Sequence, residues 1–139
     1  MKFDYIKQPS QIDPSKPWIS RPIIPVRLSC NSLDIDVYAL IDSGADCSVF
    51  DAEIAEQLGL DLESGRKQEL YGASGAPIEV YYHTVKLQPV GAKAFAEAEV
   101  RFSRDTKMWA LLGQADFFQH YQIKFERYKG QIEVKAAGG

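Results

Sequence analysis

A carboxylate at the start of a sharp turn is the part of the sequence best suited to chemistry. Asp42 ends an apolar run typical of a buried strand, and Ser43 and Gly44 follow it. A carboxylate at the mouth of such a strand is costly to desolvate, so it needs hydrogen-bond donors, a charged partner or a function. The simplest alternative is an Asx turn, in which Asp42 accepts hydrogen bonds from its own loop and Gly44 supplies an unusual backbone angle.

Two further segments bear on the interpretation of Asp42. Residues 70–78 predict a glycine-bearing hairpin, and residues 111–113 (Leu-Leu-Gly) end an apolar strand before a second helix. Taken alone, each segment is ordinary, because glycine suits any tight hairpin. The presence of all three segments in this order favours a functional role for Asp42 over a simple turn.

Length, composition and charge indicate a single globular domain. The chain of 139 residues is long enough to bury a core without metal or disulfide bonds. A composition of 45% hydrophobic and 25% charged residues excludes disorder and coiled-coil structure. Its 16 basic residues are scattered among 19 acidic ones without a basic stripe, so no nucleic-acid partner is expected. No apolar run has the length of a signal peptide or a membrane span, so we expect a cytoplasmic protein with no membrane partner.

Cysteine and histidine usage does not support a metal site. Cys30 and Cys47 lie in unlike contexts without metal-ligand spacing, so we expect free, buried thiols. His83 lies in an expected strand and His120 in an amphipathic segment, and both are interpreted as structural or surface residues. The aspartates of residues 42–51 do not follow the pattern of an EF-hand calcium loop. We therefore expect no metal and no cofactor.

The pattern along the chain predicts a mostly β domain at residues 23–135. Residues 1–22 contain four prolines, so we expect an extended N-terminal arm without regular elements, and residues 136–139 are expected to be a flexible tail. Short β-branched and aromatic runs broken by turn residues predict the strands. They are expected at residues 23–29, 33–41, 68–72, 78–87, 95–102, 108–112, 122–127 and 131–135.

Two short helices are expected between the strands. In the first, at residues 51–60, Asp51 is suited to the N-cap and Gly59 to the position after the C-cap. The second is expected at residues 115–121, where three aromatic side chains form an apolar stripe. Such a stripe indicates core packing rather than a ligand site.

These motifs together resemble the retropepsin-like aspartic proteases, the half-size relatives of pepsin. Residues 39–46 (Ala-Leu-Ile-Asp-Ser-Gly-Ala-Asp) resemble the family's apolar-apolar-Asp-Thr/Ser-Gly-Ala signature, and residues 111–113 resemble its apolar-apolar-Gly motif. Residues 58–60 (Leu-Gly-Leu) are also similar, and residues 111–118 are closest in style to prokaryotic members. The resemblance spans residues 23–135. It implies a small closed β-barrel of retropepsin type, two copies of which pair to form one active site.

The resemblance also implies roles for individual residues. Asp42 would be the catalytic carboxylate, and the hydroxyl of Ser43 would brace the paired loops. The residues implied to contact substrate are Gly44, Ala45 and Asp46 in the loop and, in a flap at the hairpin, Ala73, Ser74 and Gly75.

The chemistry of peptide hydrolysis explains why a second chain is expected. Two carboxyl groups that share one proton can activate a water and later protonate the leaving amine, whereas a single carboxylate cannot do both. The sequence has a single Asp-Ser-Gly, so the second carboxylate must come from another copy. We therefore expect a homodimeric aspartic endopeptidase that acts on a peptide or protein substrate and places Asp42 opposite its symmetry mate.

One departure from the family pattern and one alternative function remain. Retroviral members usually carry an arginine after the Leu-Leu-Gly motif, whereas this chain has Gln114, which cannot form a charge-assisted bidentate pair with Asp46. The alternative to an enzyme is a catalytically silent dimeric module that binds a peptide or protein on the same fold.

Overall fold

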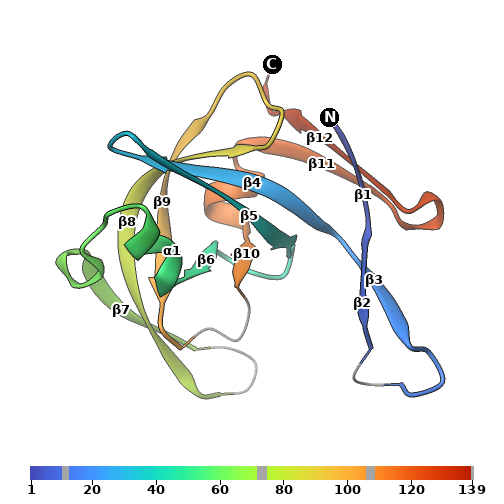
Figure 1. Ribbon diagram of the computed structural model, residues 1–139, viewed down its shortest axis with the longest axis horizontal. Helices are drawn as coiled ribbons and strands as arrows, with labels where there is room; N and C mark the ends of the chain where they lie inside the picture. Colours follow the sequence, from blue (N-terminus) through green and yellow to red (C-terminus); the bar gives the residue numbers. More distant parts are fainter. Residues whose placement is uncertain (11–12, 72–74, 106–108, 139) are drawn as a thin grey trace.

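The computed structural model describes residues 1–10, 13–71, 75–105 and 109–138, and its main body is a ring of β-strands (Figure 1). Seven strands form one sheet in the order β4-β5-β10-β6-β9-β8-β7, and β4 also pairs with β8, which closes the ring. The mostly β, closed fold expected from the sequence is confirmed. The strands are β4 (Ile23–Cys30), β5 (Leu33–Ile41), β6 (Val49–Asp51), β7 (Arg66–Tyr71), β8 (Pro77–Pro89), β9 (Ala96–Ser103) and β10 (Ala110–Leu112).

Alternating side chains along these strands supply the core. On β5, Val37, Ala39 and Ile41 are buried whereas Tyr38 between them is exposed, as the two-residue period of a strand requires. The fully buried core includes Phe50, Phe102, Phe117, Ile54 and Leu112. The expected strands within residues 23–112 lie within a few residues of those observed, except that β6 was not predicted. A strand of three residues is too short to show an alternating apolar pattern.

The strand β10 lies between two partners that are distant from it in sequence. It runs parallel to β5, with Leu112 opposite Ile41, and antiparallel to β6, with Ala110 opposite Phe50. The chain therefore leaves β5, turns and comes back as β6 on the other side of β10. This crossing brings the turn after β5 next to the residues that follow β10.

The two predicted helices differ in how closely the observed structure matches the prediction. Helix α1 (Ala52–Gln57) is capped by Asp51, whose side chain accepts a hydrogen bond from the Glu53 amide, and Gly59 has φ +71°, as predicted. A 3₁₀ turn, η1 (Leu62–Ser64), follows it. The second helix is a single π turn, η2 (Gln114–Phe118). No described helix is long and apolar enough to cross a membrane.

The aromatic side chains in and just after η2 pack in the core, as expected. The Phe117 ring lies 5.0 Å from that of Tyr121, and both side chains are buried. Tyr121 is not helical, because it begins β11 (Tyr121–Glu126).

The prediction that residues 1–22 lack regular elements is wrong. They contain β1 (Lys2–Asp4), β2 (Ile6–Pro9) and β3 (Trp18–Arg21). β1 pairs with β12 (Gln131–Ala136), which a 3₁₀ turn, η3 (Arg127–Lys129), joins to β11. β2 and β3 form a hairpin that projects from the body (Figure 1). Pro9 pairs with Trp18 at the end of this two-stranded ladder next to the connecting loop, where its missing N–H is tolerated.

The Asp51 cap gives a direct test of the local structure at α1. Asp51→Ala removes the hydrogen bond to the Glu53 amide and should lower the free energy of unfolding by about 1 kcal/mol in urea titrations. Asp61→Ala is the matched control, because Asp61 precedes η1 without a side-chain cap and should change stability much less. Equal losses in the two variants would contradict the capping role of Asp51.

Candidate active site

The backbone of the Asp42 loop forms the Asx turn that the sequence allows. The Gly44 amide donates to Asp42 Oδ1 at 2.9 Å, and the Ala45 amide donates to the Asp42 carbonyl at 3.1 Å. Asp42 is half-buried, while Ser43 and Gly44 are exposed. The turn therefore orients the carboxylate without covering it.

The segment after β10 holds the same loop from the other side. The Asp42 amide donates to the Leu112 carbonyl at 2.9 Å, and the Gln114 amide donates to the Ala45 carbonyl at 2.9 Å. The Gln114 side chain donates from Nε2 to the Ser43 carbonyl at 2.7 Å. Gln114 thus supports the backbone of the loop, and it does so without the charge of the arginine expected in retroviral members.

Gly113 is required by close packing rather than by an unusual backbone angle. A Cβ atom at this position would lie 2.4 Å from the carbonyl carbon of Cys47, closer than packed atoms come. The amide of Gly113 donates to Ser48 Oγ at 3.0 Å. Any side chain here would push the end of β10 away from the Asp42 loop.

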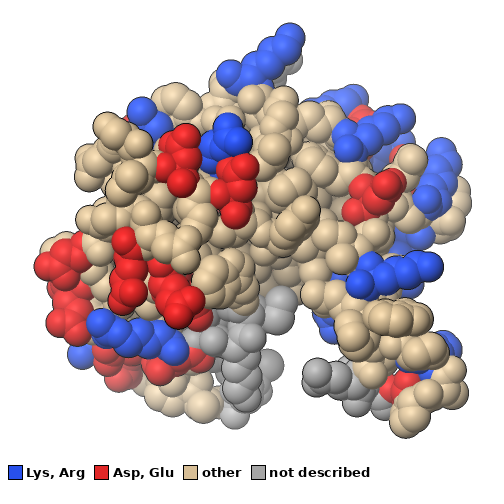
Figure 2. Space-filling model, viewed as in Figure 1, with Lys and Arg blue, Asp and Glu red and all other residues tan. Residues whose placement is uncertain are grey.

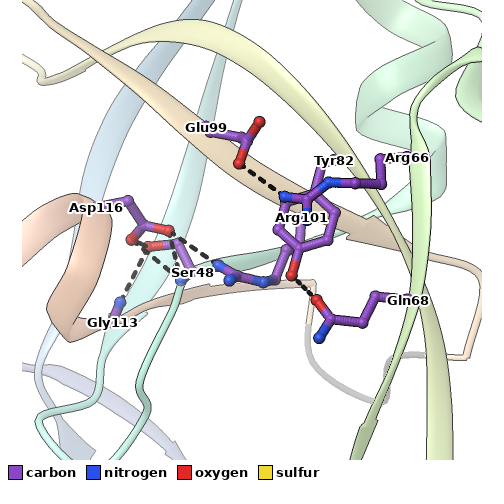
Figure 3. Close-up of polar contacts among 8 residues, drawn as sticks. All are labelled: Ser48, Arg66, Gln68, Tyr82, Glu99, Arg101, Gly113 and Asp116. Carbon is purple, nitrogen blue, oxygen red and sulfur yellow. Dashed lines mark hydrogen bonds and ion pairs between the residues drawn. The ribbon is translucent and has the colours of Figure 1, made fainter.

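A buried carboxylate that the sequence analysis missed supports the far end of the loop (Figure 3). Asp116, in η2, is 4% exposed, and its two oxygens accept the Ser48 amide at 3.0 and 2.8 Å and the Ser48 hydroxyl. Burial raises the pKa of the Asp116 carboxyl, while the hydrogen bonds from Ser48 and the charge of Arg101 act in the opposite direction. The available signal was an acid inside the apolar run of residues 115–118.

Arg101 of β9 extends this network to the hairpin of β7 and β8. Its guanidinium lies 3.8 Å from an Asp116 oxygen and 4.5 Å from the centre of the Tyr82 ring. The guanidinium of Arg66 also lies over this ring, at 4.0 Å, and the Tyr82 hydroxyl donates to Gln68. Polar and cation–π contacts therefore join the loop support to the base of the hairpin (Figure 3).

The two thiols are free. Cys47 is buried behind the loop, and this burial raises the pKa of its thiol, although the charge of Arg101 acts in the opposite direction. Cys30 is only partly buried. A protonated, buried thiol next to the loop is a packing group rather than a nucleophile.

The hairpin expected to act as a flap is formed by β7 and β8. Gly75 lies at its end, is exposed and has φ +78°, a left-handed conformation that favours glycine. Ala73 and Ser74, also predicted to contact substrate, lie outside the described residues.

An apolar groove lies next to the Asp42 loop. It has a volume of about 660 Å³, and the side chain of Leu40, two residues before Asp42, forms part of its wall. The groove opens where the molecule is hollowed between the β2–β3 hairpin and the body (Figure 2). Its lining residues are Ile6, Gln8, Ile23, Tyr38, Leu40, Trp109 and Ala110.

The chain thus combines a ring of strands, a turn bearing Asp42 and a crossing strand, β10, that is followed by Gly113. Residues 25–113 match the model of a family described as aspartyl protease. The chain belongs to this family. A comparison with curated proteins finds no match.

Solved structures of retropepsin type share the fold of this chain. A retropepsin-like aspartic protease from Rickettsia conorii matches with a TM-score of 0.59 and 17% identity, over 81% of this chain and 89% of that one. The retroviral protease-like domain of Ddi1 from Leishmania major gives 0.57 and 18%, over 84% and 90%. EIAV protease, solved with the inhibitor HBY-793, gives 0.52 and 23%, over 68% and 82%. At these identities the likeness concerns the fold.

The structure brings most of the expected site residues together. Asp42, Ser43, Gly44, Ala45 and Asp46 share one loop, with Asp46 exposed and its carbonyl accepting the Ala115 amide at 2.9 Å. Their roles in catalysis and substrate binding stay predictions.

Loss of the Asp116 carboxylate should destabilise the protein strongly. In Asp116→Ala the buried Ser48 amide loses its acceptor and Arg101 loses its counter-ion, so we expect about 3 kcal/mol less stability in urea titrations. Asp36→Ala is the control, since it breaks an ion pair with Arg27 in which both side chains are well exposed, and it should cost far less. Similar losses would show that burial of Asp116 has no special importance.

Proposed function

We propose that this protein is an aspartic endopeptidase that acts as a homodimer. A water held between two Asp42 carboxyl groups, one from each copy, attacks the scissile carbonyl. The observation that carries this proposal is the half-buried carboxylate of Asp42, which accepts the Gly44 amide while the Asp42 amide donates to Leu112 of β10. Family membership supports the same chemistry.

The geometry of the loop explains how the Asp42 carboxylate would be oriented toward a second carboxylate while one of its oxygens stays available. The Asx turn uses Oδ1, and among the described residues no hydrogen bond reaches Oδ2. Two such groups brought together cannot both ionise, so they share one proton, and one group acts as base while the other acts as acid. The exposed Ser43 and Gly44 would face the partner loop and the substrate backbone.

The apolar groove supports a preference for bulky apolar side chains in the substrate. An extended peptide bound beside Asp42 would direct a side chain toward the wall formed by Leu40, Ile23 and Trp109. Removal of an apolar side chain from water into such a groove contributes favourably in proportion to its area. The Gly75 end of the β7–β8 hairpin would cover the peptide from the opposite side.

The role of Asp42 is tested by replacing its carboxylate with an amide of the same shape. Asp42→Asn should lower kcat for peptide cleavage by at least about 10³-fold, because an amide can neither accept nor deliver the shared proton. Wild-type activity should follow a bell in pH, since only the singly protonated pair works. The measurement is digestion of a peptide library at several pH values, with wild type and variant in parallel.

Controls separate this outcome from a loss of fold. Asp34→Asn changes an exposed aspartate on β5, the strand that precedes Asp42, and should leave activity and stability unchanged. Undiminished cleavage by Asp42→Asn would overturn the assignment. A wild-type protein that binds peptides without cleaving them at any pH would instead support the binding-module alternative.

The groove makes a separate prediction about specificity. Trp109→Ala should lower kcat/KM about tenfold for peptides with bulky apolar side chains at the cleavage site, and less for peptides with alanine there, because part of the wall is lost. Phe125→Ala is matched in exposure, since both residues are 41% exposed, but Phe125 lies on β11 away from the groove. An equal effect of Trp109→Ala on both classes of peptide would exclude the groove as the specificity pocket.

A further inference from the structure

The β2–β3 hairpin makes no backbone ladder with the other strands that the structure describes. Among the described residues, β2 and β3 pair only with each other, through four residue pairs from Ile6–Arg21 to Pro9–Trp18. A two-stranded hairpin is marginally stable by itself in water, so it needs a surface to pack against. The hairpin nevertheless projects away from the ring (Figure 1).

Within the described part of the chain, one face of the hairpin packs toward the body and the other does not. Ile6 and Gln8 point to the groove beside the Asp42 loop and are partly buried. Alternation along the strands places Lys7 and Pro9, with Trp18 opposite Pro9, on the other face. Trp18 is 60% exposed, which is costly for the largest apolar side chain of the hairpin.

The proposed active site also lacks something that only a second copy can supply. Each chain provides one Asp42, and a stable protein interface buries about 800 Å² on each partner, close to a tenth of this chain's surface of 8394 Å². Ser43 and Gly44 are small and cannot provide such an area by themselves. Further contact surface is therefore needed near the Asp42 loop, and the hairpin lies next to it.

We propose that the β2–β3 hairpin is a dimerisation arm, which packs the face carrying Trp18 against a second copy of this chain and so brings the two Asp42 loops together. The arm shares the wall of the groove with Leu40, two residues before Asp42, so an interface on the arm would lie close to the loop contact. This inference rests on the proposed function for its purpose, but the dimer that it describes can be measured without catalysis.

The experiment uses the full chain with Asp42→Asn, so that association is measured in the absence of self-digestion. Sedimentation equilibrium gives the dimer dissociation constant for this protein and for the same protein with Trp18→Ser. We expect that constant to rise at least about tenfold, because a tryptophan buried at an interface typically dominates its affinity. Circular dichroism checks that the variant keeps its fold.

A matched surface change controls for the loss of an exposed aromatic side chain. Tyr128, in η3, is 82% exposed, and Tyr128→Ser should change the dissociation constant by no more than about twofold. The arm is excluded if Trp18→Ser dimerises as strongly as its parent, or if the parent remains monomeric at every concentration.

Fluorescence provides a second readout that requires no change in the arm. The chain has two tryptophans, so Trp109→Phe leaves Trp18 as the sole tryptophan. Its emission maximum should move to shorter wavelength as rising concentration drives dimerisation, and an emission independent of concentration would overturn the proposal. An inactive protein that still dimerises through Trp18 would contradict the proposed function alone.

Discussion

The strand β10 has a partner on each side, and the position of the Asp42 loop depends on this double pairing. β10 pairs in parallel with β5 and antiparallel with β6. It therefore holds in place the two strands that the Asp42 loop connects. The Leu112 carbonyl then accepts the Asp42 amide, and Gly113 allows the backbones to approach closely. The loop is thus held by main-chain hydrogen bonds, which do not depend on side-chain identity.

The buried carboxylate of Asp116 is the second constraint on the site. A charge removed from water needs donors, and Asp116 finds them in the amide and hydroxyl of Ser48, which follows the loop, and a cation in Arg101. Arg101 also stacks on Tyr82 in the hairpin that would cover a substrate. One connected network therefore joins the support of the Asp42 loop to the base of the β7–β8 hairpin, so a displacement of one would shift the other.

Local sequence patterns were sufficient to predict most strands of the ring, but they failed where a strand pairs with a distant part of the chain. The strand β5 matches its predicted range, and Asp51 caps α1, because alternation and capping are properties of neighbouring residues. β1 was missed because its partner β12 lies at the opposite end of the chain. The second helix was predicted to reach Tyr121, but the π turn η2 ends at Phe118, because Tyr121 pairs with Ala136 in the C-terminal hairpin.

The sequence by itself determined the chemistry that the site can offer. The Asp-Ser-Gly turn, the apolar strand before it and the Leu-Leu-Gly motif are local features, and they identified the family and predicted a half-site with one carboxylate per chain. Only the tertiary structure decided what surrounds that carboxylate. Asp116 and Ser48 are separated by 68 residues, and Gln114 and Ser43 by 71, so their contacts exist only after the ring has closed. Local sequence patterns encode which residues turn or extend, whereas contacts over such distances depend on how the whole chain packs.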